Sequence, residues 1–107
     1  MVLRGEVYYA ELSGSFGSEQ SGYRPVVIVQ NNKGNRYSPT VIVAPISTKL
    51  GKHPLPTHVY IPSDILERKS MILLEQLRTI DRKRLKQRVT MLDDSIMEQV
   101  NQAICIS

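Results

Sequence analysis

The chain has 107 residues, 41% of them hydrophobic, and its 14 basic and 10 acidic side chains give a formal net charge of +4. This length fits one domain over residues 1–107 with a modest core, and no apolar run approaches the roughly 18 residues of a membrane helix. A single cysteine, Cys105, excludes an internal disulfide framework and is typical of a reducing compartment, so we expect a cytoplasmic protein with no membrane partner.

The first half of the chain is predicted to form three strands separated by polar loops. Residues 7–12, 24–30 and 40–46 are rich in β-branched, aliphatic and aromatic side chains, which favour strands. Residues 13–23 form a connection that is long for a hairpin, and loops of this length are usually functional or disordered. The Asn, Gly, Ser and Pro content of residues 31–39 predicts a turn-rich connection.

The second half continues the strand pattern and ends in a helix. Residues 57–61, 70–80 and 88–92 are predicted as the fourth, fifth and sixth strands, with one helical turn at 81–85. The last segment is predicted to be a helix because Asp93 or Asp94 can cap it and because apolar residues then recur every three or four positions: Ile96, Val100, Ala103 and Ile104. The fold class is therefore mainly β with a C-terminal helix, folded as a small antiparallel barrel.

Basic residues dominate the middle of the chain. Between Gln20 and Ser63 there is no carboxylate, and five residues are basic: Arg24, Lys33, Arg36, Lys49 and Lys52. Arg24 follows a glycine-rich polar loop and opens an apolar strand, so we expect its guanidinium at the rim of the sheet. A guanidinium stays charged and presents five donors in a fixed fork, which suits a phosphate group. The sequence therefore favours a nucleic acid as the partner.

The expected pairing of strands brings hydroxyl groups to the same rim. If residues 24–31 and 40–47 form an antiparallel hairpin, Arg24 lies near Ser47 and Thr48, at the end opposite the turn. The long loops that flank this hairpin in the sequence meet at that end as well. We therefore expect one rim with an arginine, two hydroxyls and two loops.

Such a rim fits the cleavage of RNA by its own ribose. Attack of a 2′-OH on the adjacent phosphodiester builds negative charge on the phosphoryl oxygens, which Arg24 would stabilise and Ser47 would hydrogen-bond. Proton donation is a second role open to Arg24, whereas arginine is a poor base, so the general base stays open. His53 in a loop and His58 in a predicted strand are interpreted as structural or exposed, and scattered histidines with one cysteine predict no metal site.

Several motifs together resemble the PemK/MazF toxin family. The resemblance runs from about residue 3 to residue 106 and is carried by GSEQ at 17–20, Gly22, RPVVIVQN at 24–31, NRYSPT at 35–40, LPTHV at 55–59 and ILLEQLRTID at 72–81. It implies an SH3-like antiparallel barrel of the MazF/CcdB type that works as a homodimer. It also implies a metal-independent, sequence-specific endoribonuclease, an mRNA interferase that cuts single-stranded RNA. Several members of the family leave a 2′,3′-cyclic phosphate and a 5′-hydroxyl.

The resemblance also assigns residues and a partner. The family's catalytic arginine matches Arg24, and its catalytic hydroxyl, most often threonine, matches Ser47; Thr48 follows directly, so the choice between the two hydroxyls stays open. RNA-binding positions of the family match Phe16, Ser18, Glu19, Gln20 and Gln76, and we add Thr48 to this set. Glu19 is interpreted first as a binding residue and second as a general base. The implied partner is a small antitoxin of the MazE type that threads an acidic or apolar tail into the RNA groove.

Two other functions stay open from the residues alone. One is a non-enzymatic toxin of the same fold, similar to CcdB, that inhibits gyrase by binding it; the other is a passive RNA-binding barrel. Arg24 could also form a structural salt bridge, and Ser47 could be a strand-end hydroxyl bonded to nearby backbone. The polar loop, Arg24 and the Ser47–Thr48 pair favour the nuclease, because an inhibitor needs no such rim.

Overall fold

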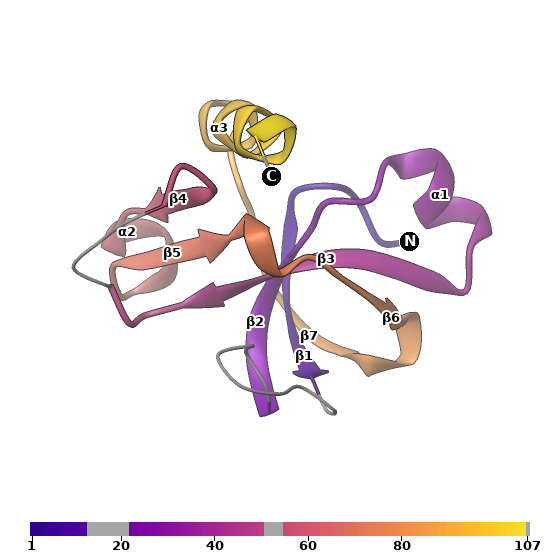
Figure 1. Cartoon of the computed structure of the whole chain (residues 1–107). Helices are drawn as coiled ribbons and strands as arrows, with labels where there is room; N and C mark the ends of the chain where they lie inside the picture. The colour runs from indigo at the N-terminus through magenta and orange to yellow at the C-terminus, as the bar shows by residue number, and fades with distance from the viewer. Residues whose placement is uncertain (13–21, 51–54, 107) are drawn as a thin grey trace.

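The computed structural model describes residues 1–12, 22–50 and 55–106 and consists mainly of one antiparallel sheet (Figure 1). The strands follow one another in the order β4-β5-β3-β2-β1-β7, and β6 pairs with β3 beside β5. Their bounds are Glu6–Leu12 for β1, Gly22–Ile28 for β2, Thr40–Ser47 for β3, His58–Ile61 for β4, Ser70–Leu73 for β5, Arg78–Asp81 for β6 and Leu85–Met91 for β7. Among the described residues the sheet is curved but not closed, since β4 and β7 end the strand order.

The β2–β3 hairpin has the register expected from the sequence. Val26 pairs with Pro45, Val27 with Ala44 and Ile28 with Val43, so the expected antiparallel pairing is confirmed. On its other side β2 pairs with β1 from Gly22 opposite Leu12 to Val27 opposite Val7. Both neighbours therefore fix the direction and face of β2.

The strand predicted over residues 70–80 is wrong as one element. It is split into β5 and β6 by a single 3-10 turn, η1 (Leu74–Gln76). Pro45 provides the physical reason. The Ile42 carbonyl accepts hydrogen bonds from the β2 side, so the alternation of a strand turns the Pro45 nitrogen toward β5 and β6, where proline has no hydrogen to donate. Pairing of β3 stops at Val43 with β6 and resumes at Ile46 with β5, and η1 fills the gap.

Two short helices were not predicted, α1 (Asn32–Tyr37) and α2 (Ser63–Leu66). In α1 the Asn31 side chain accepts a hydrogen bond of 2.8 Å from the Gly34 N–H and caps the helix. Asn and Gly have low helix propensity, so a composition that indicates a turn hides this helix. The strand predicted over residues 88–92 corresponds to β7, which starts three residues earlier, at Leu85. The helical turn predicted before it is confirmed as the 3-10 turn η2 (Arg82–Arg84).

The C-terminal helix α3 (Asp94–Ile106) confirms the predicted cap and stripe. Asp93 Oδ1 accepts a hydrogen bond of 2.9 Å from the Ile96 N–H. Ile96, Val100 and Ala103 are buried in a core cluster beneath the helix, which packs against β4 and η1 (Figure 1). A second core cluster, with Val26 and Ile28 among its members, fills the opposite face of β2. No helix of the described residues is long and apolar enough to span a membrane.

Candidate active site

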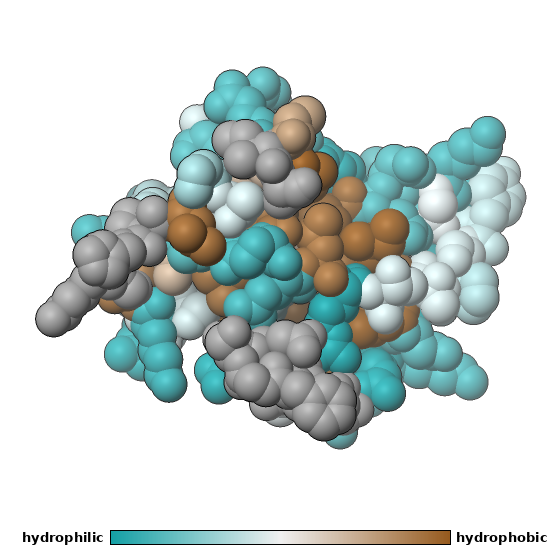
Figure 2. All heavy atoms as spheres, viewed as in Figure 1, coloured by the Kyte–Doolittle hydropathy of each residue, from teal (hydrophilic) through white to brown (hydrophobic). Residues whose placement is uncertain are grey.

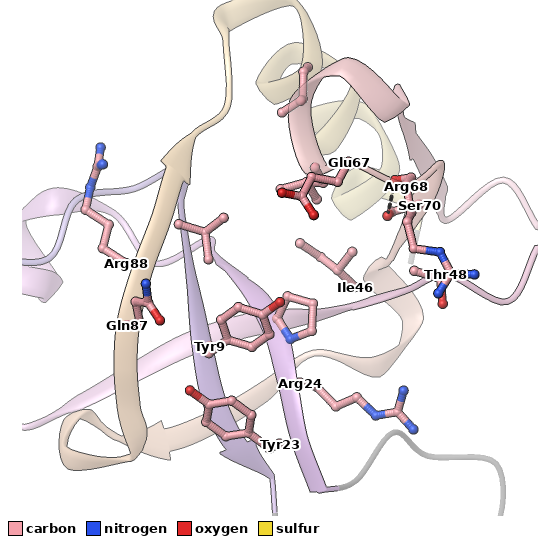
Figure 3. Close-up of a pocket in the computed structure, with 14 residues that line it drawn as sticks. Tyr9, Tyr23, Arg24, Ile46, Thr48, Glu67, Arg68, Ser70, Gln87 and Arg88 are labelled. Carbon is pink, nitrogen blue, oxygen red and sulfur yellow. Dashed lines mark hydrogen bonds between the residues drawn. The ribbon is translucent and has the colours of Figure 1, made fainter.

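A cleft of about 610 Å³ opens beside the ends of β2 and β3 (Figure 3). Strands β1, β2, β3 and β7 line one side of it, and α2 with the residues that follow lines the other. Tyr9 and Tyr23 stack in it with ring centroids 5.1 Å apart and an angle of 7° between the ring planes. Tyr23 is 58% exposed, so this stack presents an aromatic surface to solvent.

Arg24 lies at the edge of this cleft because of the conformation of β2. Gly22 is the first residue of the strand and has a φ of 78°, a backbone conformation that favours glycine. Arg24 follows two residues later, at the rim of the sheet. Tyr23 and Pro25 then share one face of the strand while Arg24 belongs to the other. Its half-buried side chain extends away from the two tyrosines in Figure 3.

Ser47 and Arg24 both lie two residues beyond the last observed β2–β3 pair, Val26 with Pro45. Continued in the same register, the pairing would bring positions 24 and 47 opposite each other, and the alternation of each strand assigns them to the same face. The Ser47 side chain is buried, and its Oγ accepts a hydrogen bond of 3.1 Å from the Lys49 N–H. This bond to backbone uses an oxygen lone pair and leaves the hydroxyl hydrogen for another acceptor.

Thr48 is placed differently from Ser47. It is exposed and lines the cleft, while Ser47 does not. The two neighbouring hydroxyls therefore point to different environments, one toward the cleft and one toward the face of β2 that carries Arg24. Their roles can be separated by experiment.

The cleft is more basic than acidic. Among the described residues, Arg24, Arg68 and Arg88 line it together with one carboxylate, that of Glu67. Arg88 pairs with the buried Glu6 carboxylate, so part of its charge is compensated inside the protein. The remaining positive charge suits an anionic ligand.

The phenol of Tyr8 is not a candidate for the general base, and the described residues hold no cluster of metal-binding side chains. Burial, followed by the neighbouring Glu6 carboxylate, raises the pKa of Tyr8 above its usual value of 10, so this phenol stays neutral at physiological pH. In the described part of the chain, no three His, Cys, Asp or Glu side chains come together.

Residues 3–107 match the family model of the PemK-like, MazF-like toxins of type II toxin–antitoxin systems. The chain belongs to this family. Over 109 residues the toxin is 55% identical to the endoribonuclease MazF of Staphylococcus saprophyticus, an alignment that covers 100% of this chain and 91% of the relative. The resemblance seen in the sequence motifs is therefore confirmed.

Solved structures confirm the fold class. A mycobacterial endoribonuclease in complex with its cognate antitoxin matches the toxin with a TM-score of 0.81 and 25% identity, over 99% of this chain and 93% of that one. MazF from Deinococcus radiodurans matches with a TM-score of 0.82 over 96% of this chain and 92% of that one. At 17% identity, the second likeness concerns the fold alone.

The remaining predicted site residues of the toxin lie outside the cleft or outside the described residues. Gln76 ends η1, is half-buried and does not line the cleft. Four predicted RNA-binding residues lie outside the described residues: Phe16, Ser18, Glu19 and Gln20. His53 lies outside them as well. His58 lies at the start of β4, as expected, and bonds to Glu75.

Sequence reasoning missed half of the cleft. The Tyr9–Tyr23 stack follows from the β1–β2 register, in which Tyr9 pairs with Pro25 and Tyr23 with Glu11, so this contact had a signal in the strand pattern. Arg68 and the rest of the wall near α2 had none, because a four-residue helix is too short to show an apolar period. The toxin's cleft thus combines a predictable wall with one that depends on tertiary packing.

Proposed function

We propose that this toxin is an endoribonuclease that cuts single-stranded RNA at specific sequences, without a metal, by attack of a ribose 2′-OH. The observation that carries the proposal is the basic cleft lined by Arg24, beside a β2–β3 register that, continued from Val26 and Pro45, would oppose Arg24 and Ser47. The family and the 55% identical endoribonuclease support it.

In the proposed reaction the 2′-oxygen forms a bond to the adjacent phosphorus and the bond from phosphorus to the 5′-oxygen breaks. The products are a 2′,3′-cyclic phosphate and a 5′-hydroxyl. The Arg24 guanidinium stabilises the charge that develops on the phosphoryl oxygens, a contribution of about 10²–10³ in rate for one fixed donor. Ser47 donates a hydrogen bond to the same oxygens. A base takes the proton of the 2′-OH and an acid gives a proton to the leaving 5′-oxygen; Arg24 is a candidate for the acid, and the base is left unassigned.

Binding is assigned to the cleft and to the loop residues of the family motif. Thr48 contacts the RNA from the cleft, and the exposed face of the Tyr9–Tyr23 stack receives a base, since aromatic rings stack on all four bases. Gln76 and the loop residues 16 and 18–20 add the contacts that select a sequence.

The proposed assembly is a homodimer that binds a cognate antitoxin in the cytoplasm. The mycobacterial relative was solved with its antitoxin, which supports the same kind of partner here. Apolar side chains gather at the centre of the face in Figure 2, and Tyr60, Leu77 and Val89 are among the exposed large hydrophobic residues, as expected of a chain that buries surface in an assembly. An acidic antitoxin tail would oppose the arginines of the cleft.

The test is cleavage of a long RNA by the purified toxin in excess EDTA, with the new ends mapped. We expect cuts at a short recurring sequence, 5′-hydroxyl and cyclic-phosphate ends, and no cleavage when the nucleotide before the cut carries a 2′-deoxyribose. The deoxy substrate is the matched control, because it keeps every phosphate and base. Intact RNA that is only retarded on a gel, or inhibition of gyrase without RNA cleavage, would refute the proposal in favour of a binding protein.

A further inference from the structure

The turn that leads into β4 is tied to η1 by a small polar network. The turn closes on itself, because the His58 N–H donates to the Leu55 carbonyl at 3.0 Å and the Leu55 N–H donates to His58 Nδ1 at 3.1 Å. A backbone N–H can only donate, so Nδ1 is the acceptor and the hydrogen of the neutral imidazole is on Nε2. The ring is thereby fixed as a donor toward η1.

Glu75 receives this donor and one more. His58 Nε2 lies 3.0 Å from Glu75 Oε2, and Thr57 Oγ1 donates to Glu75 Oε1 at 3.0 Å. A third bond joins the backbones, from the Leu74 N–H to the Thr57 carbonyl at 3.0 Å. Both carboxylate oxygens of Glu75 are therefore engaged, and its side chain has one orientation.

The position of this network in the fold indicates that it orients η1. Proline at position 45 leaves η1 between β5 and β6 without a ladder partner on β3, so η1 depends on other contacts for its orientation. Buried Leu74 provides the apolar contact, and Thr57, His58 and Glu75 provide the polar ones. Gln76, which the family motif assigns to RNA binding, is the next residue along the chain.

We propose that Thr57, His58 and Glu75 form a clamp that positions Gln76 for RNA recognition. The inference rests on the proposed function and assigns positioning roles, not catalytic ones, to the three residues. The Glu75 side chain is 30% exposed, and a hydrogen bond from a neutral imidazole to a partly exposed carboxylate adds only modestly to stability. Its value to the toxin is therefore geometric, and loss of the clamp should weaken RNA selection more than it weakens the fold.

The two nitrogens of His58 allow the clamp to be divided by substitution. A glutamine amide reaches the position of Nε2 and keeps the donor to Glu75, while an asparagine amide reaches only the position of Nδ1 and keeps the acceptor for Leu55. We expect His58→Asn and Glu75→Gln to raise the KM for an RNA oligonucleotide containing the mapped cut site about tenfold, the weight of one good hydrogen bond, with kcat within about twofold. His58→Gln should restore a KM near that of the wild type.

The control is Glu98→Gln, which makes the same chemical change on an exposed position of α3 and should change neither constant. Thermal unfolding of each variant separates the clamp from a purely structural role. A lowered Tm with unchanged KM and unchanged cut sites in Glu75→Gln would overturn the proposal, as would equal KM values for the two His58 variants.

Nuclear magnetic resonance tests the clamp without cleavage. The ¹⁵N shifts of the His58 ring should report a hydrogen on Nε2, and the side-chain amide signals of Gln76 should move in Glu75→Gln and not in Glu98→Gln. If the wild type cuts no RNA, the proposed function fails while these signals still decide the clamp. A hydrogen on Nδ1, or Gln76 signals that ignore Glu75→Gln, would overturn it.

Discussion

The two ends of the β2–β3 hairpin are both polar, yet they use their polar groups in opposite ways. At the connected end Asn35 is fully buried, its Nδ2 donates to the Gln30 carbonyl at 2.9 Å and its Oδ1 accepts from Gln30 Nε2 at 3.1 Å. At the open end Arg24 and Thr48 line a cleft whose described lining has three arginines and one carboxylate. The connected end satisfies its own polar groups, whereas the open end presents donors and positive charge outward.

The difference separates a structural region, the connected end, from the proposed site at the open end, although the family motifs cover both ends. The segment 35–40 is as conspicuous in the sequence as the segment around Arg24, but the polar side chains of Asn35, Ser38 and Thr40 are used inside the fold. Arg82 adds to this scaffold by donating to the Ser38 carbonyl at 2.9 Å and to the Asn35 carbonyl, at the C-terminal end of α1, where a cation is favourable. Changes at the connected end should therefore cost stability, and changes at the open end should cost activity.

Arg24→Ala is the sharpest test of the open end. We expect a loss of about 10²–10³ in the cleavage rate under single-turnover conditions, because the variant removes one fixed donor to the developing charge. The Tm should change little, since Arg24 belongs to the rim and not to either core cluster.

Arg36→Ala is the matched control for Arg24→Ala. Arg36 is an exposed arginine of α1, at the connected end, with its guanidinium carbon 5.6 Å from the centre of the Tyr37 ring. It should leave the rate unchanged. The comparison of the two ends would be wrong if the Arg36 variant lost activity as Arg24→Ala does, or if Arg24→Ala cut RNA at the wild-type rate.

Asn35→Ala tests the connected end. It removes both side-chain bonds to Gln30 and leaves a partly buried carbonyl without this donor, which we expect to lower the free energy of unfolding by about 1–3 kcal/mol. For a domain of this size each kcal/mol lowers the Tm by roughly 4–8 °C, so calorimetry will detect it.

The same variant should keep its rate of RNA cleavage. Well below its Tm, Asn35→Ala should cleave RNA within about twofold of the wild type, because the scaffold contacts no phosphate. Gln99→Ala, at an exposed position of α3, is the control for stability and should change neither quantity. A large loss of single-turnover rate in folded Asn35→Ala would show that the connected end belongs to the site.

The sequence predicts the open end of this comparison better than the connected end. The apolar segments on either side of a polar connection predict the β2–β3 register, because pairing of adjacent strands is local, and this register is observed from Val26 to Ile28. The approach of Arg24 to Ser47 stays a prediction from that register. Helix α1 was missed because its stability comes from side-chain caps such as Asn31, which composition counts as turn residues. The break at η1 had a signal in Pro45, but recognising it requires knowing which side of β3 the nitrogen faces. The wall near α2 depends on Ile65 and Leu66 packing against the core, which no local pattern contains.

The two hydroxyls at positions 47 and 48 give the finest test of the open end. Ser47→Ala should lower the single-turnover rate about tenfold with an unchanged KM, as expected for one neutral hydrogen bond made in the transition state. Thr48→Ala should instead raise the KM a few-fold at constant rate, because Thr48 lines the cleft and Ser47 does not. Ser47→Thr keeps a hydroxyl at the position where the family most often has threonine, and should retain activity if the buried site accepts one methyl group. If the rate falls in Thr48→Ala and not in Ser47→Ala, the working hydroxyl is that of Thr48, and Ser47 serves only to hold the Lys49 N–H at the strand end.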